Sequence, residues 1–427
     1  MQFLQVVLVC VIVAGALQVG LWIRNAKYIA AIFGSVYIVV YLVDVLNISM
    51  SESTYIAASV GRRSASEGAV STAIVAVIVT WILFSLSVQA IIRRQDQRGA
   101  PVTVVRTHRF SLMVFVLLSI IFGGAVLSKI LTVGIAETLQ LRQAVFSDNF
   151  LVLLGYFILP VLVSLGLCHA VQTKGMKALL MWILVLGLLG VTALTGSRSG
   201  LFLGAVLPVL ALYAKKIAAS TQSVGRDMQR LLLTVALIAV PVLGGGFYLA
   251  NTRGLVESGS VLNGTDISQA DVLVDLISAE AGGVGGGSSY LASLTSALPR
   301  SLWPDKPLPG NVLSSILLTP DRYYTTGAET TAGLLGEAYI NAGHFAPAVA
   351  AFLMLAFLLV CSKFLDSAND ITWMLGVILL VRGLNLLRGD MTNVIVPATA
   401  AILVWVMLHR KNRENFLEGS PPMTVRS

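Results

Sequence analysis

Charged residues are scarce in this chain of 427 residues. Lysine, arginine, aspartate and glutamate make up 12% of it, whereas 56% is hydrophobic. A soluble globular domain carries about 25% charged residues. Apolar runs of about 20 residues recur along the sequence, and a helix of that length crosses a bilayer. The composition therefore excludes an ordinary soluble enzyme domain and predicts an all-α polytopic membrane protein.

Cysteine is also rare, and the usual metal patterns are missing. Cys10, Cys168 and Cys361 each fall in an apolar run, so we expect no disulfide and no metal site at them. A DxD pattern is absent from the polar segments predicted outside the membrane, so we expect no metal and no cofactor. The net charge of +8 is spread over many short loops. That pattern indicates anionic lipid, not nucleic acid, as the partner of the basic residues.

The apolar runs predict about eleven membrane-spanning helices. They lie at about 3–23, 28–48, 70–92, 110–131, 149–171, 178–195, 200–214, 231–250, 333–361, 371–387 and 391–408. The run at 333–361 is expected to be broken. The chain then divides into helices 1 to 8 (1–250), a large external loop (251–332), helices 9 to 11 (333–408) and a tail (409–427).

Lysine and arginine in the short loops orient these helices. The loop between the third and fourth helices is the most basic, with Arg93, Arg94, Arg98, Arg106 and Arg109, so we place it inside the cell. Arg62 and Arg63, in an external loop, oppose this bias but do not outweigh the other loops. This orientation puts the N-terminus and the segment 251–332 outside, and the C-terminus inside.

The external segment has an organisation of its own. The stretches 266–280, 290–298 and 311–319 are each expected to form a short helix. Between the first two lies GGVGGGSS, Gly282–Ser289, which predicts a flexible joint. No Lys-Ser or Lys-Thr follows these glycines, so they do not form a phosphate-binding P-loop.

Seven basic residues on or near the external face are candidates for substrate binding once the orientation is set. Several converging guanidinium groups suit a diphosphate, which accepts bidentate hydrogen bonds. An arginine at membrane depth is costly unless it is paired or used. The alternatives for these residues are pairing with a nearby acid or anchoring in lipid headgroups. The seven are Arg198, Arg253, Arg300, Lys306, Arg322, Arg382 and Arg388.

The segment GEAYINAGH supplies the candidates for proton transfer. Glu337 and His344 are seven residues apart, which puts them on one face if the segment is helical. Tyr339 and Asn341 add polar groups that could orient a substrate. The alternative for Glu337 is a structural salt bridge, and His344 could simply lie at the membrane interface. Asp390 is interpreted as an internal partner for Arg388 or Arg382.

Three motifs together resemble the Wzy family of O-antigen and exopolysaccharide repeat-unit polymerases. They are TGSRSG around Arg198, SALPRSLWPDKP around Arg300, and GEAYINAGHF around Glu337. The RGD turn at Arg388 is also similar. The resemblance covers about 181–397. Where many members have Phe-Gly and an apolar residue, this chain has Ala-Gly-His at 342–344.

The resemblance implies a GT-C-type glycosyltransferase in a bacterial inner membrane, with a periplasmic N-terminus and a cytoplasmic C-terminus. Its substrates would be undecaprenyl-diphosphate-linked oligosaccharides, as donor and as acceptor, and its partners a chain-length regulator and a flippase. On this reading Arg198, Arg253 and Arg388 bind the diphosphate, supported by Arg300, Lys306 and Arg322. Glu337 is the candidate base.

Three alternatives remain. An O-antigen ligase uses the same donor but transfers the glycan to lipid A core. A transporter or flippase for the lipid-linked glycan predicts charged residues along a path through the membrane centre, whereas here the charge lies at the outer helix ends. A non-enzymatic scaffold leaves the set of arginines without a role.

Overall fold

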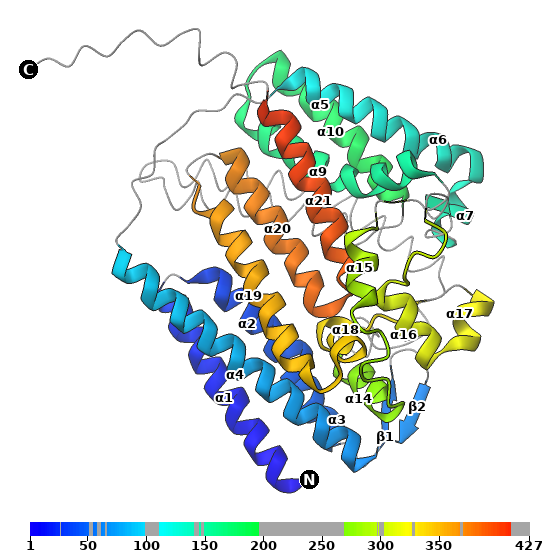
Figure 1. The fold of residues 1–427 in the computed structure, drawn as a ribbon. Helices are drawn as coiled ribbons and strands as arrows, with labels where there is room; N and C mark the ends of the chain where they lie inside the picture. The colour runs from blue at the N-terminus through cyan, green and yellow to red at the C-terminus, as the bar shows by residue number, and fades with distance from the viewer. Residues whose placement is uncertain are drawn as a thin grey trace, which may run out of the picture. The chain divides into compact units, whose positions relative to one another are not determined.

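The computed structural model describes most of the chain. The described residues are 1–25, 27–50, 54–57, 61–64, 66–98, 111–140, 145–146, 149–195, 269–296, 298, 303–326, 329–367 and 370–410. They are almost entirely helical, which confirms the predicted all-α class (Figure 1). The exception is a short hairpin in which β1 (Thr54–Ala57) pairs antiparallel with β2 (Gly61–Ser64).

Nine of the predicted spans coincide with described helices. These are α1 (Gln2–Arg24), α2–η1–α3 (Tyr28–Met50), α4 (Glu67–Arg98), α5–η2–α6 (Leu112–Val133), α9 (Phe150–Gln172), α10 (Met176–Leu194), α18–η4–α19 (Gly333–Leu365), α20 (Asp370–Arg388) and α21 (Thr392–Arg410). The two remaining predicted spans, 200–214 and 231–250, lie outside the described residues.

Within the described residues, seven of these helical segments are long and apolar enough to cross a membrane. Helix α20 is not among the seven, and the apolar part of α21, Thr392–Met407, is shorter. The chain thus has the helices of a multi-pass membrane protein. The count of eleven spans stays a prediction.

The chain contacts divide the protein into two compact units. The first comprises Met1–Val102, Ser258–Ser362 and Arg382–Val396, and the second comprises the remaining residues. Helices α19, α20 and α21 each contribute to both. The predicted division in sequence order, with a separate external loop, stays a prediction.

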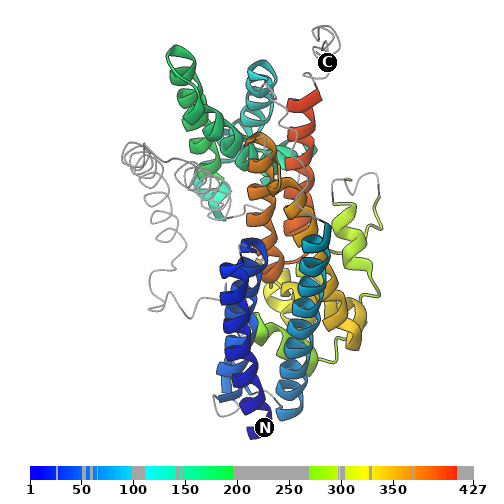
Figure 2. The ribbon, with the colours of Figure 1, turned by 90° about the vertical axis from the view of Figure 1, so that its left-hand side faces the viewer.

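In the first unit, α1 lies alongside both α2 and α4 (Figures 1 and 2). Aromatic side chains join these helices. Trp22 of α1 contacts Trp81 of α4 at a centroid distance of 6.1 Å, and Tyr37 of α2 stacks on Trp81 at 5.9 Å. Because these rings are apolar and nearly fully buried, they fix the lateral packing of the first helices.

Short helices of the predicted external loop belong to the same unit. They are α14 (Ala270–Ser278), α15 (Ser288–Leu294), α16 (Gly310–Leu318) and α17 (Pro320–Thr326). Three of the helices expected from the sequence are therefore confirmed. Helix α14 contacts α3, α4 and α18, and the side chain of Asp44 accepts a hydrogen bond from the Ala270 N–H at 2.8 Å. These helices are therefore built onto the apolar helices of this unit.

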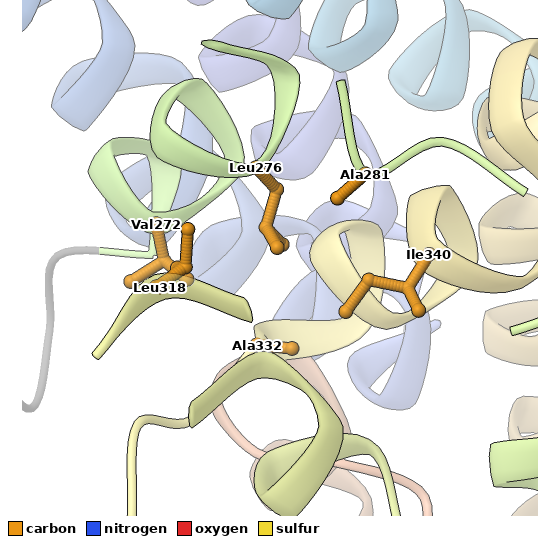
Figure 3. Close-up of a cluster of buried hydrophobic side chains, with 6 residues drawn as sticks. All are labelled: Val272, Leu276, Ala281, Leu318, Ala332 and Ile340. Carbon is orange, nitrogen blue, oxygen red and sulfur yellow. The ribbon is translucent and has the colours of Figure 1, made fainter. Parts of the chain in front are cut away.

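A small apolar core holds these short helices together. Val272 and Leu276 of α14 pack with Leu318 of α16 and Ile340 of α18, and Ala281 and Ala332 complete the cluster (Figure 3). All six side chains are buried. Burial of apolar surface at about 25 cal/mol per Å² makes such a core the main local source of stability.

The predicted break in the ninth span is confirmed, at Gly343. Helix α18 (Gly333–Ala342) ends there, η4 (Gly343–Phe345) forms a single turn, and α19 (Ala346–Leu365) continues. Gly343 has φ of +55°, a conformation that a residue with a side chain rarely adopts. The break therefore depends on glycine, and it separates the short polar α18 from the apolar α19.

The second unit is built around α9. Gly166 of α9 packs tightly between neighbouring helices, since a Cβ atom there would lie 2.6 Å from both Phe115 of α5 and Val185 of α10. At Gly155 the backbone oxygen of Phe122 would lie 3.1 Å from such a Cβ. Small residues at these two points let the helices approach closely, as is typical of membrane helix packing.

Candidate functional site

Glu337 lies at the centre of the candidate site. It belongs to α18 and is only 1% exposed. The hydroxyl of Ser289, in the first turn of α15, donates to its Oε1 at 2.6 Å. The backbone N–H of Met391, just before α21, donates to its Oε2 at 2.7 Å. One carboxyl group thus joins three segments that are far apart in the sequence.

Gly310 packs against another side of the same carboxyl group. A Cβ atom on Gly310 would lie 2.7 Å from Oε1 and 2.7 Å from Cδ of Glu337, so any side chain there would displace the carboxyl group. Gly310 is the first residue of α16. Glu337 therefore lies against the N-terminus of α16, where the helix dipole favours negative charge.

Asp390 is the second buried acid of the site, with no exposed surface. Its Oδ1 accepts hydrogen bonds from Asn393, through the backbone N–H at 3.0 Å and Nδ2 at 2.7 Å. Its Oδ2 accepts one from the backbone N–H of Asn311 at 3.3 Å. Asp390 thereby caps the start of α21 and also holds the start of α16.

Glu337 and Asp390 form a pair of interacting buried acids. Their partners within the described residues are hydroxyl, amide and backbone N–H groups, with no lysine or arginine among them. Burial raises the pKa of Asp390, an effect that its hydrogen bonds partly offset. The interpretation of Asp390 as a partner of Arg388 or Arg382 is wrong. Asp390 instead accepts hydrogen bonds from amide groups at the starts of α16 and α21.

Asn341, predicted to bind substrate, is buried and forms hydrogen bonds to both Glu337 and α15. Its Nδ2 donates to the backbone oxygen of Glu337 at 2.8 Å and to the Ser289 hydroxyl at 2.7 Å. Its Oδ1 accepts a hydrogen bond from the Ser289 N–H at 3.4 Å. Asn341 therefore orients the hydroxyl group that Glu337 contacts.

The glycine-rich segment before α15 is a packed turn, and the prediction of a flexible joint is wrong. The N–H of Gly283 donates to the Tyr339 oxygen at 3.0 Å, and the N–H of Gly285 donates to the Ile340 oxygen at 2.8 Å. A Cβ on Gly285 would lie 2.8 Å from Oδ1 of Asn341. These glycines are needed because the turn lies directly on α18, a contact that composition alone does not reveal.

Tyr41 anchors the site to the second helix of the chain. It lies in the π-helical turn η1 (Ile38–Val43), and its hydroxyl donates to the backbone oxygen of Leu387 at 2.7 Å. The same hydroxyl accepts from the Leu335 N–H at 3.3 Å. Tyr41 therefore links the end of α20 to the start of α18, the two helices that carry Arg388 and Glu337.

The predicted cationic residues are only partly placed. Arg388 is half-buried in the last turn of α20, and Arg382 is 7% exposed in the same helix, as expected for a deeper residue. Nζ of Lys306 donates to the Leu298 oxygen at 3.1 Å. Arg198, Arg253 and Arg300 lie outside the described residues, and so does the side chain of Arg322 in α17.

The remaining candidates differ in exposure. His344 lies in η4 and is exposed, whereas Tyr339 is half-buried against the glycine turn. Glu337 is therefore enclosed by protein, whereas His344 is exposed. Their predicted common helical face does not form, because the helix ends at Gly343 between them.

Several residues of the site were not predicted from the sequence. Ser289, Asn311, Asn393 and Tyr290 carry no motif, and each is common in loops and helix starts. Burial, and then the nearby Glu337, raise the pKa of the Tyr290 phenol. The one available signal was the position of Asp390 directly before an apolar run, which is typical of a residue that caps a helix.

No group of three or more potential metal ligands occurs among the described residues. Comparisons with protein-family models, with curated proteins and with solved structures found no match to this chain.

Proposed function

We propose that this protein is a membrane glycosyltransferase of GT-C-like architecture that polymerises polysaccharide repeat units. It joins oligosaccharides carried on undecaprenyl diphosphate at the periplasmic face of a bacterial inner membrane. The growing chain moves from its lipid to the non-reducing end of the next unit. The reaction uses no metal and no cofactor.

One observation carries the proposal. The Met391 N–H donates to Glu337. Met391 follows Arg388, the last residue of α20, by three residues, so this hydrogen bond fixes the end of α20 against α18. Glu337 and Arg388 come from the two most polar late motifs of the sequence, and they share this junction. An arginine held at a rigid helix end is suited to bind a diphosphate in a defined geometry.

The proposed glycosyl transfer requires stabilisation of negative charge on the leaving group more than it requires a strong nucleophile. The bond that breaks joins the anomeric carbon to the diphosphate, and the bond that forms joins that carbon to an acceptor hydroxyl. Negative charge builds up on the departing diphosphate, which guanidinium groups can stabilise. The acceptor hydroxyl loses its proton in the same step. Glu337 is closed off in this conformation, so the proton passes to water or to an oxygen of the departing diphosphate.

The test is synthesis by the purified protein in nanodiscs, supplied with undecaprenyl-diphosphate-linked repeat units as the sole substrate. A ladder of lipid-linked products longer than one repeat is expected, and it should persist with a chelator present. A second arm adds lipid A core as acceptor. Transfer to lipid A core without any ladder would replace the polymerase with a ligase, and no transfer in either arm would refute the proposal.

A further inference from the structure

The two buried acids of the site have partners of different kinds. Each of the two oxygens of Asp390 accepts a hydrogen bond from an N–H group, which can donate but cannot accept, and the Thr392 hydroxyl is a further partner. Glu337 contacts one N–H group, from Met391, and one hydroxyl group, from Ser289. A hydroxyl can donate to an ionised carboxylate or accept from a neutral carboxyl group.

Two neighbouring carboxylates cannot both be ionised at low cost when they are buried, because each charge disfavours the other. In the part of the chain that the structure describes, the hydrogen bonds to the two acids come from hydroxyl, amide and backbone N–H groups. Among the described residues, the Tyr290 phenol of α15 interacts with Glu337, and Glu329 accepts a hydrogen bond from the side chain of Asn311. Helix α16 and the first turn of α21 present no charged side chain, and Arg388 precedes Asp390 by two residues.

We propose that Glu337 and Asp390 share one proton, which Glu337 carries, and that this pair of a neutral and an ionised group holds the turn Gly389–Met391 next to Arg388. This inference rests on the proposed function for its catalytic consequence. Glu337 then acts as a positioning residue and not as the base predicted from the sequence. Its proton bonds to the Ser289 hydroxyl, while its other oxygen keeps the Met391 N–H.

The arrangement explains why this pair is located at a helix junction. Asp390 as a carboxylate satisfies the donors at the starts of α16 and α21. A neutral Glu337 accepts from Met391 without adding a second charge. If Glu337 also ionised, repulsion would push α18 away from the turn, and the position of Arg388 would change with it.

The first test measures the proton directly and does not depend on activity. Infrared spectra are recorded at neutral pH for the wild-type protein and for Glu337→Gln, with Glu67→Gln as a control at an exposed acid. A carboxylic-acid C=O band is expected in the difference between wild type and Glu337→Gln, and none between wild type and the control. Cell-free synthesis with carbon-13-labelled glutamate should shift this band, whereas labelled aspartate should not. A missing band, or a shift with labelled aspartate, would overturn the inference.

The second test separates positioning from general-base catalysis. Polymer synthesis by wild type should decline on the alkaline side, where the shared proton is lost. Glu337→Gln supplies a permanently neutral group of the same shape, so its alkaline decline should move to higher pH or vanish. A folded Glu337→Gln protein that is inactive at every pH would show that Glu337 is the base. If wild type makes no polymer at all, the proposed function fails, and the infrared test still decides whether the proton is shared.

Discussion

The backbone N–H of Met391 donates to Oε2 of Glu337 at 2.7 Å, across 54 residues of sequence. This hydrogen bond ties α18, the first part of the broken ninth span, to the loop between the last two helices. Arg388 lies at the end of the helix before that loop. The position of a predicted substrate-binding arginine therefore depends on a residue predicted to be catalytic.

Loss of Arg388 should stop polymer formation. The guanidinium group is proposed to stabilise the departing diphosphate, and removal of one such donor typically lowers kcat by about 10²–10³-fold. Arg388→Ala and Arg198→Ala should each lose long products in the nanodisc assay while the protein stays folded. Arg24→Ala is the matched control, since Arg24 is exposed at the end of α1 and predicted to face the cytoplasm. Normal product lengths in both test variants would contradict the diphosphate role.

The two acids should respond unequally to neutral substitution. Asp390→Asn places an amide where both oxygens now accept from N–H groups, so a donor loses its acceptor. An unsatisfied buried donor costs about 1–3 kcal/mol. Glu337→Gln can accept from Met391 and donate to Ser289, so it should cost less. Thermal unfolding in detergent measures both. The reverse order would place the proton on Asp390.

Stability should fall as pH rises. Burial raises the pKa of Asp390 above its ordinary value of about 3.9, so the interacting pair of acids keeps one proton to higher pH in the folded protein than the two separate groups do in the unfolded chain. The stabilising contribution of the protonated pair is thus complete below the ordinary value and is lost as pH rises through the raised one. Unfolding temperatures measured from acidic to alkaline pH should decline for wild type and decline less for Glu337→Gln. Parallel profiles for the two proteins would exclude a contribution from the pair.

The glycine turn offers a test of packing alone. Gly285→Ala puts a methyl group 2.8 Å from Oδ1 of Asn341, which must move. Overpacking of this kind costs about 1–3 kcal/mol. Val284→Ala is the control, since Val284 is 61% exposed in the same turn. A lower unfolding temperature for Gly285→Ala only is expected. Equal stability of both variants would restore the flexible joint predicted from composition.

The helices could be predicted because long apolar runs have few alternatives in a membrane. Predicted spans at 3–23, 149–171 and 371–387 match α1, α9 and α20 to within a few residues. The short helices near 311–319 and 290–298 were also found, since Pro and Gly mark their ends. The hairpin β1–β2 was missed, because its strands carry two arginines and no apolar alternation.

The site was predictable only as a set of residue types. Glu337 was selected because an acid beside an apolar helix is costly, and its burial agrees with that reasoning. Its partners could not be predicted. Ser289 and Met391 lie 48 and 54 residues away, and one of them contributes only its backbone. A backbone donor leaves no trace in residue identity.

The sequence by itself determined the membrane character, the positions of most helices and the presence of a break in the ninth span, because hydropathy and backbone conformation are local properties. The tertiary structure decided what the polar residues do. It packed the glycine turn onto α18, enclosed Glu337 and Asp390 together, and matched them with donors from helix starts instead of arginines. These outcomes follow from contacts between distant segments, where the cost of burying a charge is set by neighbours that the local sequence does not name.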